Sequence, residues 1–301
     1  MNIAVAATPS VAIPTLNALL DSEHHLDFVI TQPDRPSGRG RALAESDVSL
    51  WCSEKKIICH KPHNASETKE LLQSVDLLIT IGYGVILSED VISTPKMGCL
   101  NLHFSLLPRW RGAAPVQRAI EAGDLISGVT VFKLDPGMDT GPIYVQKRFA
   151  LDSDISSDAL VQELAELGPE AILESIRAID DGLSPTPQNN GLATRALKLS
   201  KEEAEVNWNS SAEEIDRKIR AFTSSPGAWT TFRGNSIKVD SPEVSETVLQ
   251  PGAIKVIDKK FLVGTSTQAI ALGFVTASGK QRMDAISWSH GARLTDEDRF
   301  G

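Results

Sequence analysis

The sequence predicts an α/β protein, with a mainly parallel sheet in the N-terminal part and a smaller C-terminal domain of short antiparallel strands. Three observations support this prediction. Short apolar runs alternate with helical patterns through the first half of the chain. A segment at residues 183–203 has no period and is rich in Pro, Asn and Thr, as a linker would be. Beyond it, one helical pattern leads into short β-like runs that are separated by turns.

The parallel sheet is predicted from apolar runs that are bounded by turn residues. These runs cover residues 2–8, 26–31, 57–60, 75–84 and 97–103. Helical patterns that end near Asp21 and span residues 48–56 separate the first runs, and strands joined through helices pair in parallel. Residues 128–135 and 141–151 then alternate apolar and polar side chains, which is typical of two antiparallel strands.

A long helix is predicted over residues 156–182, with leucines repeating along one face. Pro169 is predicted to break or kink this helix, because an interior proline removes a backbone hydrogen bond. Residues 32–41, "QPDRPSGRGR", are predicted to form a loop. The C-terminal domain is predicted as a helix over residues 211–222, followed by a small β-barrel or sandwich. Its β-like runs cover residues 228–239, 252–265 and 269–281.

The composition is that of a protein with a sizeable core, since apolar residues make up 41% of the 301 residues. The three cysteines form neither a CxxC motif nor a zinc-binding spacing, so we expect free thiols in a reducing compartment. The first residues lack the basic start of a signal peptide, and no run approaches the ~20 apolar residues that span a bilayer. We therefore expect a cytoplasmic protein that does not contact membranes.

The net charge of −9 argues against indiscriminate nucleic-acid binding. Residues 207–301 nevertheless carry 12 Lys and Arg against 11 Asp and Glu, so the negative charge lies in the first part of the chain. That distribution allows a polyanionic partner at a local basic patch. No G-x-G-x-x-G follows the first apolar run and no P-loop motif occurs, so nucleotide-dependent redox or phosphoryl chemistry has no support.

The stretch "LNLHFSLLPRWRGAAP", residues 100–115, places polar side chains at the end of a predicted strand. Asn101 and His103 are two residues apart, so they project to the same side. An amide NH₂ and a protonated imidazole together suit an oxyanion, at roughly 3 kcal/mol per donor. Asp139, in the glycine-rich segment 134–142, is the carboxylate that we expect to orient His103 or to move protons.

On these residues alone, other interpretations stay open. A polar residue near a strand end is usually a satisfied structural group, and an aspartate between glycines is often only a turn residue. A hydrolase built from Ser105, His103 and Asp139 is a further alternative, although no G-x-S-x-G elbow surrounds the serine.

The chain resembles the folate-dependent formyltransferases, in particular those that act on methionyl-tRNA, in the strings "SLLPRWRGAAP", "MDTG", "TQPDRPSGRGR", "KLSKEEAEVNW" and "GKQRM". This resemblance spans nearly the whole chain. It implies a Rossmann-like catalytic domain at residues 1–189, a linker at 190–206 and an OB-like tRNA-binding domain at 207–301. It also implies transfer of a formyl group from 10-formyltetrahydrofolate to the α-amino group of methionine on initiator tRNA. No metal is needed for a donor that is already activated, and we expect a monomer.

Carried over position by position, Asn101, His103 and Asp139 fall on the catalytic trio of that family. Its folate-contacting segment falls on Ser105, Leu106, Leu107 and Pro108. Whether the Leu107–Pro108 peptide bond is cis or trans stays open, since X-Pro bonds take both forms. Contacts to tRNA phosphates are assigned from charge alone to Arg35, Arg39, Arg41, Lys198 and Lys201.

The sequence departs from the family pattern after the arginine-rich loop, where it reads "ALAESDVS" in place of lysines and a proline-flanked serine. Glu45 and Asp47 weaken the positive charge there. Two other functions stay open: a formyltransferase acting on an amino sugar nucleotide with the same trio, and an RNA-binding protein without catalysis. "RWRGAAP" favours the tRNA enzyme over the sugar enzyme, and the presence of all three trio residues favours an enzyme over a silent binder.

Overall fold

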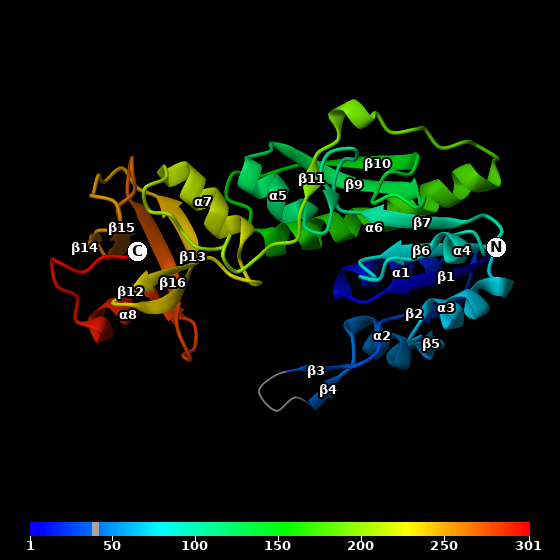
Figure 1. Cartoon of the computed structure of the whole chain (residues 1–301), viewed down its shortest axis with the longest axis horizontal. Helices are drawn as coiled ribbons and strands as arrows, with labels where there is room; N and C mark the ends of the chain where they lie inside the picture. Colours follow the sequence, from blue (N-terminus) through cyan, green and yellow to red (C-terminus); the bar gives the residue numbers. More distant parts are fainter. Residues whose placement is uncertain (38–41) are drawn as a thin grey trace. The chain divides into compact units, whose positions relative to one another are not determined.

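The computed structural model describes residues 1–37 and 42–301, and the chain divides into two compact units (Figure 1). The N-terminal unit consists of Met1–Pro115, Ile126–Ala150 and Val161–Ala196. The C-terminal unit consists of Val116–Leu125, Leu151–Leu160 and Leu197–Gly301. The domain boundaries expected from the sequence stay predictions.

A seven-stranded sheet forms the centre of the N-terminal unit, in the order β10-β9-β7-β6-β1-β2-β5. The five strands from β5 to β7 are parallel, and β9 and β10 are antiparallel to their neighbours, which confirms the predicted mainly parallel sheet. The strands are β1 (Asn2–Ala7), β2 (His25–Ile30), β5 (Cys59–His60), β6 (Leu77–Ile81), β7 (Cys99–His103), β9 (Ile126–Lys133) and β10 (Ile143–Ala150).

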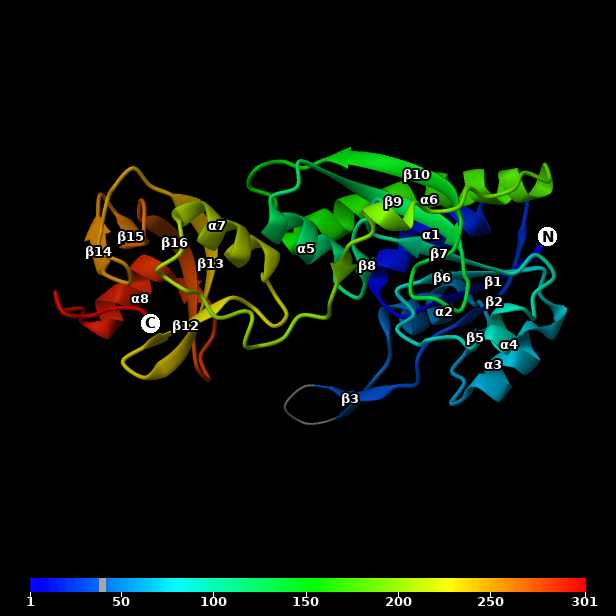
Figure 2. The same ribbon diagram turned by 45° about the horizontal axis from the view of Figure 1, so that its top comes forward.

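Helices cover both faces of this sheet (Figures 1 and 2). They are α1 (Ile13–Leu20), α2 (Asp47–Lys55), α3 (Ala65–Leu71), α4 (Glu89–Ile92) and the part of α6 (Ser157–Asp180) from Val161 onward, with the 3₁₀ turns η1 (Ser10–Ala12), η2 (Leu72–Ser74) and η3 (Asn190–Leu192). Helix α5 (Pro115–Ala122) lies almost wholly in the C-terminal unit. α6 packs closely on one face, because a Cβ atom at Gly168 would lie 2.6 Å from Thr15 Oγ1 and 2.8 Å from Leu102 Cδ2. Helix α6 runs unbroken through Pro169, so of the break or kink predicted there the break is wrong, and the kink stays a prediction. Packing against the sheet compensates for the one backbone hydrogen bond that a proline removes.

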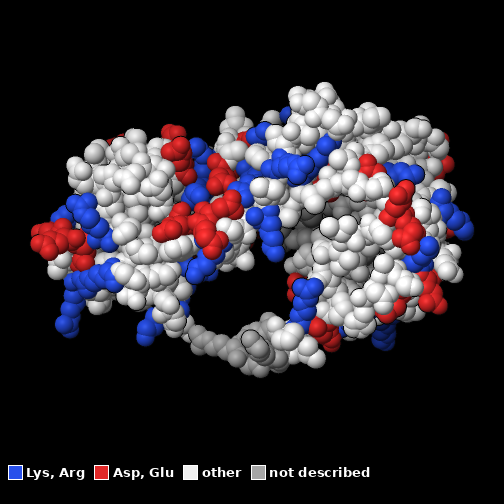
Figure 3. Space-filling view, in the orientation of Figure 1, with Lys and Arg blue, Asp and Glu red and all other residues white. Residues whose placement is uncertain are grey.

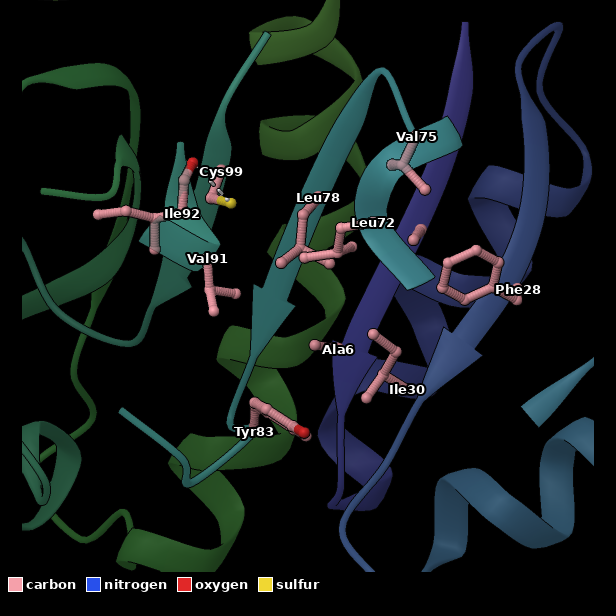
Figure 4. Packing of buried hydrophobic residues seen from close by; sticks show 11 residues of the cluster. Ala6, Phe28, Ile30, Leu72, Val75, Leu78, Tyr83, Val91, Ile92 and Cys99 are labelled. Atoms are coloured by element: carbon pink, nitrogen blue, oxygen red, sulfur yellow. Dashed lines mark hydrogen bonds between the residues drawn. The ribbon is translucent and has the colours of Figure 1, made fainter. Parts of the chain in front are cut away.

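The other face carries a core cluster that follows the two-residue alternation of the strands (Figure 4). Ala6, Phe28 and Leu78 lie on the neighbouring strands β1, β2 and β6. They pack with Leu72 and Val75 from the segment that follows α3. Cys99 closes the cluster at the start of β7, with its thiol donating to the carbonyl oxygen of Ile92. Burial raises the pKa of Cys99 to about 12, so this thiol is neutral at physiological pH.

Two short paired segments lie outside the main sheet. β3 (Arg35–Ser37) pairs with β4 (Ala42–Ala44) in an antiparallel hairpin, so the segment predicted as a loop is partly a strand. Alternating contacts across the pair stabilise an extended backbone that turn-forming residues alone do not predict. β8 (Arg111–Gly112) pairs in parallel with β11 (Arg195–Ala196), within the segment predicted as a linker.

The C-terminal unit is built on an antiparallel sheet in the order β12-β13-β16-β15-β14, with β17 added on β16, as the β-like runs predicted. Its elements are α7 (Ala212–Ala221), β12 (Trp229–Phe232), β13 (Asn235–Val244), β14 (Ile254–Ile257), β15 (Lys260–Val263), β16 (Ile270–Ala277), β17 (Met283–Asp284) and α8 (Ala285–Ala292). Arg299 and Phe300 bridge residues at the two edges, Ala253 and Phe232, and so join the edges of the sheet.

Phe300 is central to the aromatic core of this unit. It is 3% exposed, and its ring lies 5.8 to 6.0 Å from the rings of Trp208, Phe232, Phe261 and Trp288. The last residues of the described chain therefore fill the core as well as close the sheet.

We expect Phe300→Ala to destabilise the C-terminal unit by about 3–5 kcal/mol, because it leaves a cavity among four rings. Urea unfolding followed by tryptophan fluorescence measures this change. Val248→Ala is the matched control, since Val248 is 73% exposed and its truncation changes stability by less than about 0.5 kcal/mol. A Phe300→Ala loss no larger than that of the control would contradict the packing role.

Candidate active site

The carboxyl ends of β6 and β7 bring together the polar side chains predicted to react. In parallel sheets, ligands bind in the crevice outside these ends. Asn101 pairs with Thr80 in the register of the two strands, so both side chains lie on the same face. The Asn101 amide donates from Nδ2 to Thr80 Oγ1 at 2.8 Å, and Thr80 Oγ1 donates to the carbonyl oxygen of Leu100 at 3.0 Å. This chain of bonds orients the amide and leaves its second N–H for a ligand.

The imidazole of His103 is held at the last residue of β7. Its Nε2 lies 2.9 Å from the carbonyl oxygen of Trp110, and since a carbonyl only accepts, Nε2 carries a proton. Nδ1 is then the ring nitrogen that faces Asp139. It lies 3.8 Å from Asp139 Oδ2, and both side chains are largely buried, at 8% and 18% exposure. A proton on Nδ1 therefore makes a close ion pair in a poorly solvated place.

Asp139 reaches the histidine from the loop between β9 and β10. Its Oδ2 accepts a 2.7 Å hydrogen bond from the backbone N–H of Gly112. Its backbone has φ +53°, a left-handed conformation that aspartate adopts more readily than most residues. Gly141 allows the loop to fold back closely, because a Cβ atom there would lie 1.7 Å from the carbonyl oxygen of Lys133.

The segment after β7 is held by a network of hydrogen bonds. Thr130 Oγ1 donates to the carbonyl oxygen of Ser105 at 2.6 Å and accepts from the N–H of Leu107 at 3.1 Å. Gln146 donates to the carbonyl oxygen of Leu107 at 2.8 Å. The Leu107–Pro108 peptide bond is cis, one of the two forms left open by the sequence. Leu106 and Pro108 are partly exposed on this ordered segment.

The alternative of a serine hydrolase is not supported by this geometry. The hydroxyl of Ser105 is buried and donates to the carbonyl oxygen of Arg109 at 2.7 Å. A nucleophilic serine instead needs a hydrogen bond to its general base. Ser105 thus stabilises the turn that follows β7.

The residues assigned to tRNA contacts fall in both units. Arg35 is exposed on β3, whereas Arg39 and Arg41 lie outside the described residues. Lys198 and Lys201 are exposed in the C-terminal unit. Lys201 Nζ lies 5.6 Å from the centre of the Trp229 ring, so this lysine is directed by a cation–π contact.

Several residues that shape the site were not predicted from the sequence. They are Thr80, Trp110, Gly112, Thr130, Gln146 and Gln188. Two of them act through backbone atoms, which any residue supplies, so side-chain patterns carry no signal for them. Of these residues, only Gly112 could have been suspected from the sequence, because glycine is favoured where another backbone approaches closely. A Cβ atom there would lie 2.5 Å from the carbonyl oxygen of Ala196.

The described residues hold neither a cluster of metal ligands nor a membrane-spanning helix. In the described ranges, no group of three or more His, Cys, Asp or Glu lies together as metal ligands would. Among the helices of the same ranges, none combines the length and apolar composition needed to cross a membrane. The expectation that the reaction needs no metal stays a prediction.

Comparison with known proteins matches both parts of the chain. Residues 1–176 match the family described as formyl transferase, and residues 198–293 match the formyl transferase C-terminal domain. A methionyl-tRNA formyltransferase of Mycobacteroides abscessus is 41% identical over 99% of both chains. One of Thermobifida fusca is 40% identical over 100% of this chain and 99% of its own.

The fold also matches solved structures. HypX of Aquifex aeolicus, crystallised with tetrahydrofolic acid, superimposes with a TM-score of 0.70 over 96% of this chain and 46% of its own, at 18% identity. At that identity the likeness concerns the fold alone. The sequence matches extend over both units and include the stretch that holds Asn101 and His103. The chain therefore belongs to the formyl transferase family.

Proposed function

We propose that this protein transfers a formyl group from 10-formyltetrahydrofolate to the α-amino group of methionine on initiator tRNA. The observation that carries the proposal is the largely buried pair of His103 and Asp139 beside the oriented amide of Asn101. Full-length relatives named methionyl-tRNA formyltransferase support the choice of acceptor. We further propose that the protein acts in the cytoplasm as a monomer.

In this proposal, Asn101 and His103 stabilise the formyl oxygen while the amine attacks the formyl carbon. The free N–H of the Asn101 amide and a protonated Nδ1 of His103 are the two donors. Each donor aimed at a developing negative charge contributes roughly 3 kcal/mol in comparable sites. The orientation set by Thr80 matters here, because a donor that is already aligned needs no rearrangement during the reaction.

Asp139 has the complementary role of helping to transfer the proton that the attacking amine loses. A new C–N bond forms at the formyl carbon, the bond to N10 of the folate breaks, and the amine gives up one proton to the leaving nitrogen. Asp139 Oδ2 faces Nδ1 at 3.8 Å and provides a carboxylate through which the amine proton can pass. The N–H of Gly112 keeps this carboxylate oriented while its charge changes.

For the folate, we propose the cis-proline segment of Ser105, Leu106, Leu107 and Pro108 as one wall. When bound, 10-formyltetrahydrofolate supplies an activated formyl group. Thr130 and Gln146 hold the carbonyl groups of this segment, so its exposed parts present a rigid surface. Leu106 and Pro108 are the partly exposed residues of this segment, so they are the apolar side chains that it offers to a flat ligand.

For the tRNA, we propose Arg35, Arg39, Arg41, Lys198 and Lys201 as phosphate contacts. The C-terminal unit, on the face shown in Figure 3, carries Lys and Arg side chains interspersed with Asp and Glu. Such a mixed surface favours a small number of specific phosphate contacts over a broad positive field.

The function is tested by supplying the protein with 10-formyltetrahydrofolate and either charged initiator tRNA or a UDP-linked amino sugar. We expect formylation of methionyl-tRNA and none of the sugar nucleotide. Formylation of the sugar without the tRNA would replace the proposed acceptor, and binding of tRNA without any transfer would favour a non-catalytic RNA-binding protein.

We expect His103→Ala to lower kcat by about 100-fold or more, because it removes one oxyanion donor and the partner of Asp139. Affinity for methionyl-tRNA should change by less than about twofold, since the imidazole is largely buried and faces the reacting atoms. Single-turnover rates and a filter-binding assay measure the two quantities. A parallel loss of affinity would contradict this division of roles.

Arg39→Ala should show the opposite pattern, with weaker tRNA binding and an almost unchanged rate at saturating tRNA. The loss of affinity relative to the wild type should shrink as salt is raised from 50 to 200 mM if the arginine contacts a phosphate, because the slope of log affinity against log salt should become shallower by about 1. Leu50→Ala, at an exposed apolar position of the same unit, is the control. An unchanged salt slope would exclude a phosphate contact.

A further inference from the structure

We propose that Gln188 is a positioning residue for Asp139, and that it acts on formyl transfer without touching either substrate. The proposal rests on the function proposed above, since it assigns Gln188 to the same trio. Gln188 lies in the aperiodic stretch after α6, and its side chain is half-buried. Nothing in the pattern of residues around it suggests a role in the site.

The amide of Gln188 makes four hydrogen bonds, all to the two segments that hold the carboxylate. Its Nε2 donates to the carbonyl oxygen of Asp139 at 2.9 Å and to that of Gly141 at 2.7 Å. Its Oε1 accepts from Arg111 Nε at 3.1 Å and from Arg111 Nη2 at 2.7 Å. Because Gly112 follows Arg111 and donates to Asp139 Oδ2, these bonds close a ring around the aspartate.

This ring of hydrogen bonds holds the backbone of Asp139 in its left-handed conformation. A residue held at φ +53° relaxes toward ordinary backbone geometry unless its surroundings prevent it. Gln188 fixes the carbonyl group of Asp139 and that of the second residue after it, while Gly112 fixes the carboxylate. The side chain and the backbone of the aspartate are therefore positioned against the same short strand, β8.

Only a neutral carboxamide satisfies both partners. It offers two donors to the loop carbonyl groups and an acceptor to the guanidinium of Arg111. A glutamate accepts from Arg111 but presents no donor to the carbonyl groups, and it adds a negative charge near Asp139. A methionine keeps the length of the side chain and makes none of the four bonds.

The backbone near Gln188 is anchored independently of its side chain. Thr186 and Ile143 exchange two hydrogen bonds, from each N–H to the other's carbonyl oxygen, both at 2.8 Å. Downstream, β11 pairs with β8. Substitutions at Gln188 should therefore leave the fold intact while they free the loop that carries Asp139.

The test compares Gln188→Ala and Gln188→Met with the wild type in formylation of methionyl-tRNA. We expect kcat to fall about 10- to 100-fold, since a misplacement on the order of 1 Å costs up to this much. KM for both substrates should change by less than about twofold. Asn189→Ala is the matched control, because Asn189 caps η3 with a bond to the N–H of Gly191 and contacts no trio residue among the described ones.

A double-mutant cycle separates positioning from general structural damage. In an Asp139→Asn background, Gln188→Met should lower the residual rate by less than about twofold, because the carboxylate it positions is gone. A full additive loss in that background, or wild-type kcat in both single variants, would overturn the proposal. Gln188→Met keeps the test valid if the alanine variant fails to fold.

Hydrogen exchange provides a readout that needs no activity. Amides of residues 137–141 should exchange faster in Gln188→Met than in the wild type or Asn189→Ala, because the loop loses two of its bonds. Unchanged exchange would overturn the proposal. If the wild type formylates no tRNA at all, the proposed function fails, and the exchange measurement still decides whether Gln188 holds the loop.

Discussion

The contact between a largely buried imidazole and a carboxylate from a separate loop is the interaction on which the candidate site depends. The Nδ1 of His103 and the Oδ2 of Asp139 lie 3.8 Å apart, although 35 residues separate them in the chain. Neither backbone position is chosen by local preference alone. The histidine is placed by the end of a parallel strand, and the aspartate by a loop with a left-handed residue, so both elements must be held against movement.

The parallel sheet holds the histidine in place, since His103 is the last residue of β7. Leu100 and Leu102 alternate with Asn101 and His103, so one face of β7 packs against the core while the other presents polar groups at the strand end. Parallel strands are buried on both faces through most of their length. Their carboxyl ends are therefore where an amide and an imidazole remain accessible without loss of core packing.

Asn101, His103 and Asp139 stay a predicted catalytic trio, of which the structure brings His103 and Asp139 to within 3.8 Å. The sequence predicted the parallel sheet and the antiparallel C-terminal unit, because both depend on side-chain patterns of short range. It did not predict the partners of the trio. Trp110 and Gly112 act through a carbonyl oxygen and an N–H, and Gln188 acts from a stretch without periodicity. The sequence also did not predict that α6 continues through Pro169; at the preceding Gly168 the helix packs closely on Thr15 and Leu102, which are distant in the chain.

The loop that carries Asp139 must also be held in place, and β8 with the residue before it does this, because it contacts both the imidazole and the carboxylate. The carbonyl of Trp110 binds His103, and the N–H of Gly112 binds Asp139. β8 is itself held by β11, where the N–H of Arg111 donates to the carbonyl oxygen of Thr194 at 2.9 Å. A side chain at Gly112 would collide with Ala196, which would separate the two strands and displace both contacts together. The stretch that contains β11 thus supports the geometry of the candidate site, because a displacement of β11 would move β8 and the two contacts to the imidazole and the carboxylate with it.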